Sequence, residues 1–236
     1  MTTILIAGGS LGGLLAANML LRDGHDVQLL EKARGSLDGR GAGIVTHQAL
    51  LDGLKRAGVT IDDSLGVQVQ SRVLLDRDGR SALQLPLPQI LTSWSRLYNL
   101  LIEAFPAERY HQGVSVSRVE QDAEGVRVHS DSGQVFEGAL LVASDGIRSA
   151  VRGQYAPEIE PQYAGYIAWR GVCDEAVLSN HCLDSVFDQF GFCLPSGEQL
   201  IGYPVRVTTT RPRAGAAATT SSGTARPTRN SPCRGC

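Results

Sequence analysis

The amino-acid sequence predicts an α/β fold, with a parallel-sheet domain first and a partial, mostly antiparallel sheet after it. Three observations support this fold class. A glycine-rich segment follows the first apolar run, helical and strand patterns alternate up to about residue 156, and short strand patterns dominate from there onwards. Alternating strands and helices are typical of parallel sheets, whereas successive short strands are typical of antiparallel sheets.

The first βαβ unit lies within residues 3–31. The apolar run Thr3–Ala7 predicts a strand, Leu14–Arg22 has a helical pattern, and Val27–Leu30 predicts a second strand. Between the first strand and the helix stands Gly8-Gly9-Ser10-Leu11-Gly12-Gly13. This order of elements predicts an adenine dinucleotide site, although a glycine-rich turn in another kind of α/β protein has a similar pattern.

Each part of this unit has a structural role in such a site. Gly8 permits a tight turn off the strand, and Gly13 permits close packing of the helix on the sheet. The loop backbone between them can approach a pyrophosphate, whose negative charge lies at the positive end of the helix. Glu31, followed by Lys32, comes 23 residues after Gly8. A carboxylate there can accept hydrogen bonds from ribose hydroxyls.

Later elements are predicted from the spacing of apolar residues and from turn signals. The predicted helices cover residues 48–57, 93–105 (with Ser93 as the N-cap) and 147–154. The predicted strands cover residues 67–75, 81–85, 114–120, 126–130, 139–143, 166–169, 185–192 and 199–205.

These elements predict a domain over residues 1–156, a partial sheet domain over 157–207, and a tail over 208–236. An alternative assigns the hairpins at 65–90 to the second sheet. The tail has five arginines, no acid and no large apolar side chain, so we expect it to be disordered.

Composition excludes several classes of function. The formal net charge is −2, and the sequence has no basic stripe with interleaved aromatics, so a nucleic-acid partner is not predicted. No apolar run is long enough to span a membrane, and the first residues do not have the pattern of a signal peptide. We therefore expect a cytoplasmic protein with reduced cysteines. The five histidines show no spacing typical of metal ligands.

A second motif lies at residues 140–152, where an apolar strand leads into Ser144-Asp145-Gly146 and then a helical pattern. A carboxylate at the end of a parallel strand faces the ligand crevice, although an ordinary Asp-Gly turn is the alternative. Together with the first glycine-rich segment, this motif resembles that of the single-component FAD-dependent aromatic hydroxylases, the group that contains p-hydroxybenzoate hydroxylase. The resemblance implies a glutathione-reductase-like FAD/NAD(P)-binding domain.

Four further segments are similar to this family. Arg40-Gly41-Ala42-Gly43-Ile44 resembles its flavin-contacting loop, and Arg96 matches an arginine that reaches the cofactor. Tyr163–Gly171 and Gly202–Val205 resemble the substrate-domain sheet of the 2,6-dihydroxypyridine hydroxylase-like branch. The resemblance covers residues 1 to about 206.

The resemblance implies roles for individual residues. The cofactor-binding residues that it implies are Gly8, Gly9, Ser10, Leu11, Gly12, Gly13, Glu31, Lys32, Arg40, Arg96, Val116, Asp145 and Gly146. Trp169 and Tyr203 are the implied substrate contacts. Surface ion pairs for the arginines, core packing for Trp169 and strand packing for Tyr203 are the alternatives.

The implied activity is hydroxylation of an aromatic or N-heteroaromatic ring, phenol-like or hydroxypyridine-like, through a flavin hydroperoxide. FAD, NADH or NADPH, and O2 are the implied cofactor, reductant and oxidant. No catalytic residue is assigned. The alternatives are an inactive, truncated remnant that binds nucleotide weakly, and an NAD-binding reductase. A homodimer is left open for the full-length form.

The tail suggests a frameshift after about residue 206. The chain has 20 arginines but two lysines, which indicates a GC-rich gene. In the frame one base earlier, Thr219–Arg226 is compatible with a further strand of the same hydroxylase branch. Cys233 and Cys236 form an unpaired C-x-x-C motif, which we interpret as a product of the altered frame and not as a metal or redox site. We expect this chain to lack part of the flavin site and to be inactive.

Overall fold

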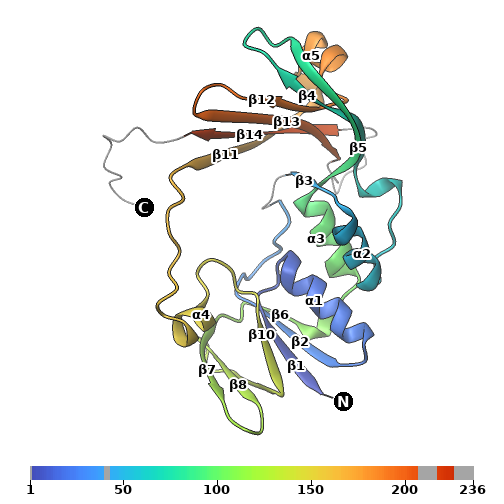
Figure 1. Cartoon of the computed structure of the whole chain (residues 1–236). Coiled ribbons are helices and arrows are strands. Elements are labelled where there is room, and N and C mark those ends of the chain that lie inside the picture. Colours follow the sequence, from blue (N-terminus) through green and yellow to red (C-terminus); the bar gives the residue numbers. More distant parts are fainter. Residues whose placement is uncertain (1, 40–42, 207–216, 226–236) are drawn as a thin grey trace. The chain divides into compact units, whose positions relative to one another are not determined.

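The computed structural model describes residues 2–39, 43–206 and 217–225, the last range by its backbone alone. The chain divides into two compact units, each built from three segments. Unit 1 comprises residues 1–40, 48–61 and 97–161, and unit 2 comprises residues 41–47, 62–96 and 162–236. The first predicted domain is therefore interrupted twice, and the hairpin within 65–90 belongs to unit 2 (Figure 1).

Unit 1 is built on a parallel sheet of four strands in the order β10-β1-β2-β6. These strands are β10 (Leu140–Ala143), β1 (Thr3–Ala7), β2 (Asp26–Glu31) and β6 (Tyr110–Gln112). All three pairings are parallel, so the carboxyl ends of the strands meet at one edge of the sheet. The predicted α/β class with a parallel sheet is confirmed.

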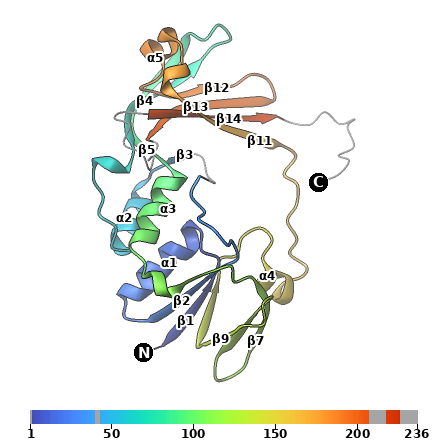
Figure 2. The same ribbon diagram turned by 180° about the vertical axis from the view of Figure 1, so that it is seen from behind.

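Two helices and most of a third, from Leu97 on, lie together in unit 1, as both ribbon views show (Figures 1 and 2). They are α1 (Leu11–Arg22), α2 (Gln48–Arg56) and α3 (Trp94–Glu103). The side chains of Leu14 and Ala17 on α1 are fully buried. The buried Asn18 amide joins α1 to α3, because it donates to the carbonyl oxygens of Leu14 and Leu101, each at 2.9 Å.

A three-stranded antiparallel sheet covers part of unit 1 (Figure 2). It consists of β7 (Val116–Gln121), β8 (Val126–Ser130) and β9 (Val135–Gly138). Val119 and Val128 of this sheet pack against Leu5 and Leu30 of the parallel sheet in one buried cluster. The parallel sheet is thus apolar on both faces, as expected for a parallel sheet in an α/β fold.

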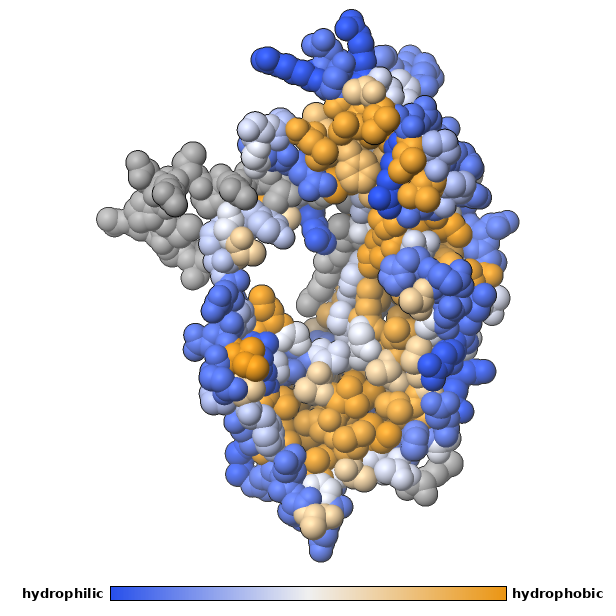
Figure 3. Space-filling model, viewed as in Figure 1, coloured by the Kyte–Doolittle hydropathy of each residue, from blue (hydrophilic) through white to orange (hydrophobic). Residues whose placement is uncertain are grey.

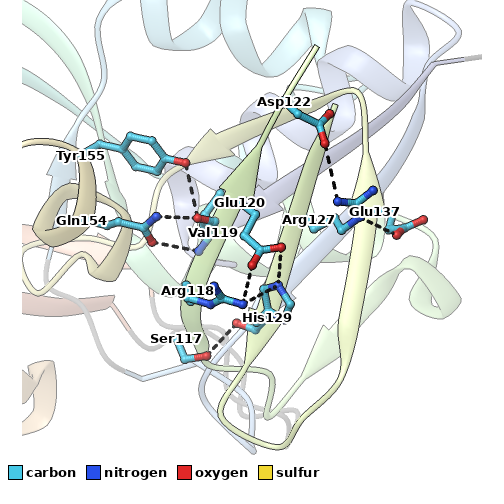
Figure 4. Close-up of polar contacts among 10 residues, drawn as sticks. All are labelled: Ser117, Arg118, Val119, Glu120, Asp122, Arg127, His129, Glu137, Gln154 and Tyr155. Atoms are coloured by element: carbon cyan, nitrogen blue, oxygen red, sulfur yellow. Dashed lines mark hydrogen bonds and ion pairs between the residues drawn. The ribbon is translucent and has the colours of Figure 1, made fainter. Parts of the chain in front are cut away.

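The short helix α4 (Ala150–Tyr155) follows the Asp-Gly motif and is attached to β7 through Gln154. The Gln154 amide oxygen accepts the Val119 N–H at 2.9 Å, and its nitrogen donates to the Val119 carbonyl at 2.5 Å (Figure 4). Gln154 therefore satisfies both backbone groups of one strand residue. Tyr155 adds a longer contact to the same carbonyl.

Charged side chains cover the outer surface of β7 and β8 (Figure 4). Glu120 forms an ion pair with Arg118 and lies 3.3 Å from the His129 Nε2, and Arg127 forms ion pairs with Asp122 and Glu137. Arg118, Asp122, Arg127 and Glu137 are exposed, whereas Glu120 and His129 are half-buried. Ion pairs at the surface contribute little to stability. Their arrangement indicates a solvated sheet face and not a binding site.

Unit 2 is built on a seven-stranded sheet in the order β11-β14-β13-β12-β4-β5-β3. Its strands are β3 (Gly43–Val45), β4 (Val67–Leu75), β5 (Ser81–Ser93), β11 (Ile167–Asp174), β12 (Phe190–Cys193), β13 (Glu198–Arg206) and β14 (Ala217–Ala225). Only the β12–β4 pair is parallel, so the predicted mostly antiparallel sheet is confirmed. Its buried cluster is formed by Val69, Leu91, Phe190, Tyr203 and Val205.

Several predicted boundaries differ from the structure. Residues 185–192, predicted as a strand, begin at the end of helix α5 (Asn180–Ser185), and the strand starts only at Phe190. Ser179 caps α5 by accepting the N–H of Cys182, which favours the helix locally. The helix predicted over 147–154 begins at Ala150, because Gly146 turns with φ +83° before it.

Part of the tail that we expected to be disordered is a strand. β14 pairs with both β11 and β13 along residues 217–225. Sheet pairing uses backbone N–H and C=O groups, so a segment without large apolar side chains can still join it. Residues 208–216 and 226–236, which include Cys233 and Cys236, lie outside the described residues.

The helices of the described part of the chain are all too short or too polar to cross a membrane. Short 3-10 helices at residues 63–65, 107–109 and 175–177 complete the elements that the structure describes.

Replacing Gln154 with Ala should lower the free energy of unfolding of unit 1 by about 1–3 kcal/mol, because the buried Val119 loses two hydrogen-bond partners. Urea unfolding followed by circular dichroism measures this change. Gln112→Ala, at an exposed position of β6 in the same unit, is the matched control and should have little effect. Equal effects of the two substitutions would contradict the anchoring role of Gln154.

Candidate dinucleotide site

The glycine-rich loop connects β1 to α1 at the carboxyl edge of the parallel sheet. Gly8 has φ +100°, a conformation that side chains disfavour. Its N–H donates to the Leu30 carbonyl at 2.8 Å, and the Ser144 N–H donates to the Ala7 carbonyl at 2.7 Å. The ends of β1, β2 and β10 therefore converge on this loop.

Two glycines of the loop are required by close backbone contacts. A Cβ atom on Gly8 would overlap the Ser144 carbonyl, and a Cβ atom on Gly13 would overlap the Gly8 carbonyl. Gly12 is less restricted, because its Cβ would lie 3.2 Å from the Ser144 hydroxyl. Helix α1 can thus begin directly against the strand ends only without side chains at Gly8 and Gly13.

The N-terminus of α1 is available to an anion. Ser10 is the N-cap residue, but its side chain forms no capping hydrogen bond, and no acidic residue lies in the first turn. The first N–H groups of a helix have no partner inside the helix, and the helix dipole adds positive potential there. A pyrophosphate supplies the acceptors and the negative charge that these groups favour.

Glu31 lies at the end of β2 and is 5% exposed. Its two carboxylate oxygens accept the N–H groups of Gly9 and Ala33, each at 2.7 Å. These hydrogen bonds fix the carboxylate beside the loop, and each oxygen keeps a second lone pair for a further donor. Lys32, the next residue, is exposed.

Tyr110 on β6 also contacts the loop, a contact that was not predicted from the sequence. Its hydroxyl donates to the Gly9 carbonyl at 3.0 Å, and a Cβ atom on Gly9 would overlap this hydroxyl. Burial raises the pKa of the Tyr110 phenol, so the group stays a protonated donor. The only signal in the sequence was a three-residue strand, which is too short to show a pattern.

Asp145 lies in the turn between β10 and α4. Its carboxylate accepts the Ala150 N–H at 2.9 Å, so it stabilises the first turn of that helix. Ser144, Asp145 and Gly146 line a cavity of about 610 Å³ together with residues of β7, β8, β10 and α4. Such a volume is typical of ligand sites.

The residues present therefore fit an adenine dinucleotide such as FAD. Unit 1 brings Gly8–Gly13, Glu31 and Ser144 together, with Asp145 adjacent to Ser144. Val116 lies at the start of β7, with its side chain against the buried cluster of that sheet. Its predicted contact with the adenine stays a prediction.

Of the two arginines predicted to contact the cofactor, the structure describes only Arg96. Arg40, with Gly41 and Ala42, lies outside the described residues. The Arg96 guanidinium in unit 2 donates to the carbonyl and the hydroxyl of Ser64, at 3.1 and 2.5 Å. Arg96 is thus held against the 3-10 helix at residues 63–65, and its contact with the cofactor stays a prediction.

Tyr203 on β13 is 8% exposed and packs edge-on against Phe190, with ring centroids 5.0 Å apart. A Cβ atom on Gly43 would lie 2.6 Å from the Tyr203 Cζ, so the ring requires a glycine in β3. Burial raises the pKa of the Tyr203 phenol. Trp169 on β11 is 70% exposed and is not a core residue in the described part of the chain.

Within residues 2–39, 43–206 and 217–225, no group of three or more His, Cys, Asp or Glu side chains is arranged to hold a metal ion.

Comparisons with known proteins agree with this geometry. A family model described as an FAD binding domain matches residues 1–187. The 2,6-dihydroxypyridine 3-monooxygenase of Paenarthrobacter nicotinovorans is 34% identical over 203 residues, which cover 86% of this chain and 51% of that protein. The 6-hydroxynicotinate 3-monooxygenase of Pseudomonas fluorescens is 31% identical over 186 residues, covering 72% of this chain and 47% of that protein.

Solved structures show the same fold. The 2,6-dihydroxypyridine-3-hydroxylase from Arthrobacter nicotinovorans superposes with a TM-score of 0.87 and 31% identity, covering 97% of this chain and 57% of that chain. The chain thus spans about half the length of the curated relatives that it matches.

Replacing Glu31 with Gln should lower the free energy of unfolding by about 1–3 kcal/mol, because an amide nitrogen would then face one of the two N–H groups. Chemical denaturation of both proteins tests this. The control is Glu124→Gln in the exposed turn before β8, which should leave stability unchanged. A Glu31→Gln protein as stable as the control would contradict the role given to this carboxylate.

Proposed function

Because the chain belongs to the family of FAD binding domains, we propose that it is a flavin-dependent monooxygenase that hydroxylates a small aromatic or N-heteroaromatic ring. The observation that carries the proposal is the loop Gly8–Gly13, with an uncapped helix end on one side and the fixed Glu31 carboxylate on the other. The named substrates of the relatives, a dihydroxypyridine and a hydroxynicotinate, support the ring class.

In this proposal the residues of unit 1 bind and orient FAD. The N–H groups at the start of α1 receive the pyrophosphate, and Glu31 accepts hydrogen bonds from the ribose hydroxyls. Asp145 and Gly146 line the cavity at the end of β10. The chemistry that FAD supplies when bound is reduction by NADH or NADPH and activation of O2 for transfer of one oxygen atom.

We assign the substrate contact in unit 2 to Tyr203. The residue is 8% exposed, and its hydroxyl lies beside Gly43 of β3. A buried hydroxyl favours a hydrogen-bonding partner, and a ring hydroxyl or ring nitrogen of a substrate would supply one. The raised pKa keeps the phenol protonated and able to donate.

FAD binding can be tested without assuming the substrate. Ser10→Asp puts a negative charge at the expected pyrophosphate, yet aspartate is as good an N-cap as serine. We expect unchanged or higher thermal stability, with the dissociation constant for FAD raised at least about tenfold by charge repulsion. Quenching of flavin fluorescence during titration measures this constant.

Ser10→Asn is the matched control, because it is a neutral N-cap of similar size. It should bind FAD almost as tightly as the unchanged protein. Equal affinities of Ser10→Asp and Ser10→Asn would contradict the placement of the pyrophosphate. A chain that binds NADH but shows no flavin absorption with added FAD would favour an NAD-binding reductase instead.

Turnover tests the role of Tyr203. In a protein of the relatives' full length, oxidation of NADH or NADPH should accelerate with a dihydroxypyridine or a phenol, and the product should contain one atom of isotopically labelled O2. The present chain, which spans about half that length, is expected to be inactive. Tyr203→Phe should raise KM about tenfold, the cost of one lost hydrogen bond, with no loss of thermal stability. Tyr163→Phe, at a residue 63% exposed, is the control. A KM that is unchanged in Tyr203→Phe would exclude this tyrosine from the substrate site.

A further inference from the structure

Unit 2 contains a second cavity, of about 150 Å³, between α5 and the sheet strands β4, β12 and β13. Its lining includes Leu75, Cys182, Phe187, Cys193, Leu200 and Gly202. Figure 3 shows hydrophobic residues gathered in the region where Figure 1 places β12 and β13. Leu200 is 50% exposed, so the cavity reaches solvent.

Two facing glycines form the floor of this cavity. Gly191 of β12 and Gly202 of β13 are cross-strand partners, so both point to the same side of the sheet. The neighbouring pair, Cys193 and Leu200, points the same way and also lines the cavity. The hollow therefore exists because two adjacent positions on this face have no side chain.

The backbone does not require glycine at either position. Neither residue has a positive φ. A Cβ atom on Gly191 would lie at an ordinary 3.5 Å from the Gly202 carbonyl, and one on Gly202 would meet no described atom within 4 Å. In contrast with Gly8 and Gly13, these glycines leave space open and do not relieve a close contact.

The lining defines the chemistry of an occupant. It contains no charged side chain, and its walls are aliphatic and aromatic, with two thiols as weak polar groups. An apolar cavity of about 150 Å³ has room for one benzene ring. We propose that this cavity binds an uncharged, single-ring aromatic molecule.

This site differs from the substrate contact assigned to Tyr203. Successive residues of a strand point to opposite faces, and the Tyr203 ring packs on Phe190 in the buried cluster. Gly202 faces the other side of the sheet, and the cavity there is also lined by Cys182 of α5. Tyr203 and Phe192 also border the cavity, as the strand neighbours of Gly202 and Gly191. The cavity floor thus lies on the face of the sheet opposite to the Tyr203 ring, and its occupancy does not require FAD.

Binding is tested with fluorobenzene on the full chain by ligand-observed fluorine NMR. We expect saturable binding that unlabelled benzene displaces. Gly202→Val fills the cavity with a residue that favours strands, so fluorobenzene affinity should fall at least about tenfold. The thermal unfolding midpoint should stay equal or rise, because a filled hollow gains contacts.

Gly191→Ala is a second variant, with a methyl group that the geometry accepts, and it should also weaken binding. Gly153→Ala, on the exposed surface of α4, adds a methyl group elsewhere and should leave binding unchanged. Absence of saturable binding to the unchanged chain would overturn the proposal. So would undiminished binding by a folded Gly202→Val or Gly191→Ala protein. A flavin absorption spectrum of the same samples reports on the proposed function separately.

Discussion

The structure of unit 1 depends on a contact between backbones at which no side chain fits. The Gly8 carbonyl occupies the place of a Cβ atom on Gly13, and the Ser144 carbonyl occupies the place of a Cβ atom on Gly8. This close approach lets α1 begin at the ends of β1 and β10, so its free N–H groups face the carboxyl edge of the sheet. Without it, the helix dipole and the strand ends would not converge on one site.

Buried polar groups then hold this loop in one conformation. Glu31 accepts two backbone N–H groups, and Tyr110 donates to the Gly9 carbonyl from a strand distant in sequence. Each hydrogen bond satisfies a group that would be costly to bury alone. Gln154 acts similarly where α4 meets β7, because it binds both backbone groups of Val119 (Figure 4).

Unit 2 uses its glycines in two different ways. Gly43 has no side chain, so the ring of Tyr203 can pack closely against its backbone in the core. Gly191 and Gly202 instead leave a hollow open on the opposite face. The same residue type therefore supports a tight contact on one side of the sheet and a cavity on the other.

The sequence by itself determined the local features, namely the strands β1, β2 and β4, helix α1 with its glycines, and Glu31 at a strand end. It also determined the cap of α3, because the Ser93 hydroxyl accepts the Arg96 N–H. Such features depend on neighbours along the chain. Only the tertiary structure decided that Tyr110 contacts the loop, that β14 is a strand, and that residues 62–96 join the second sheet. These depend on contacts between distant segments, which periodicity does not encode.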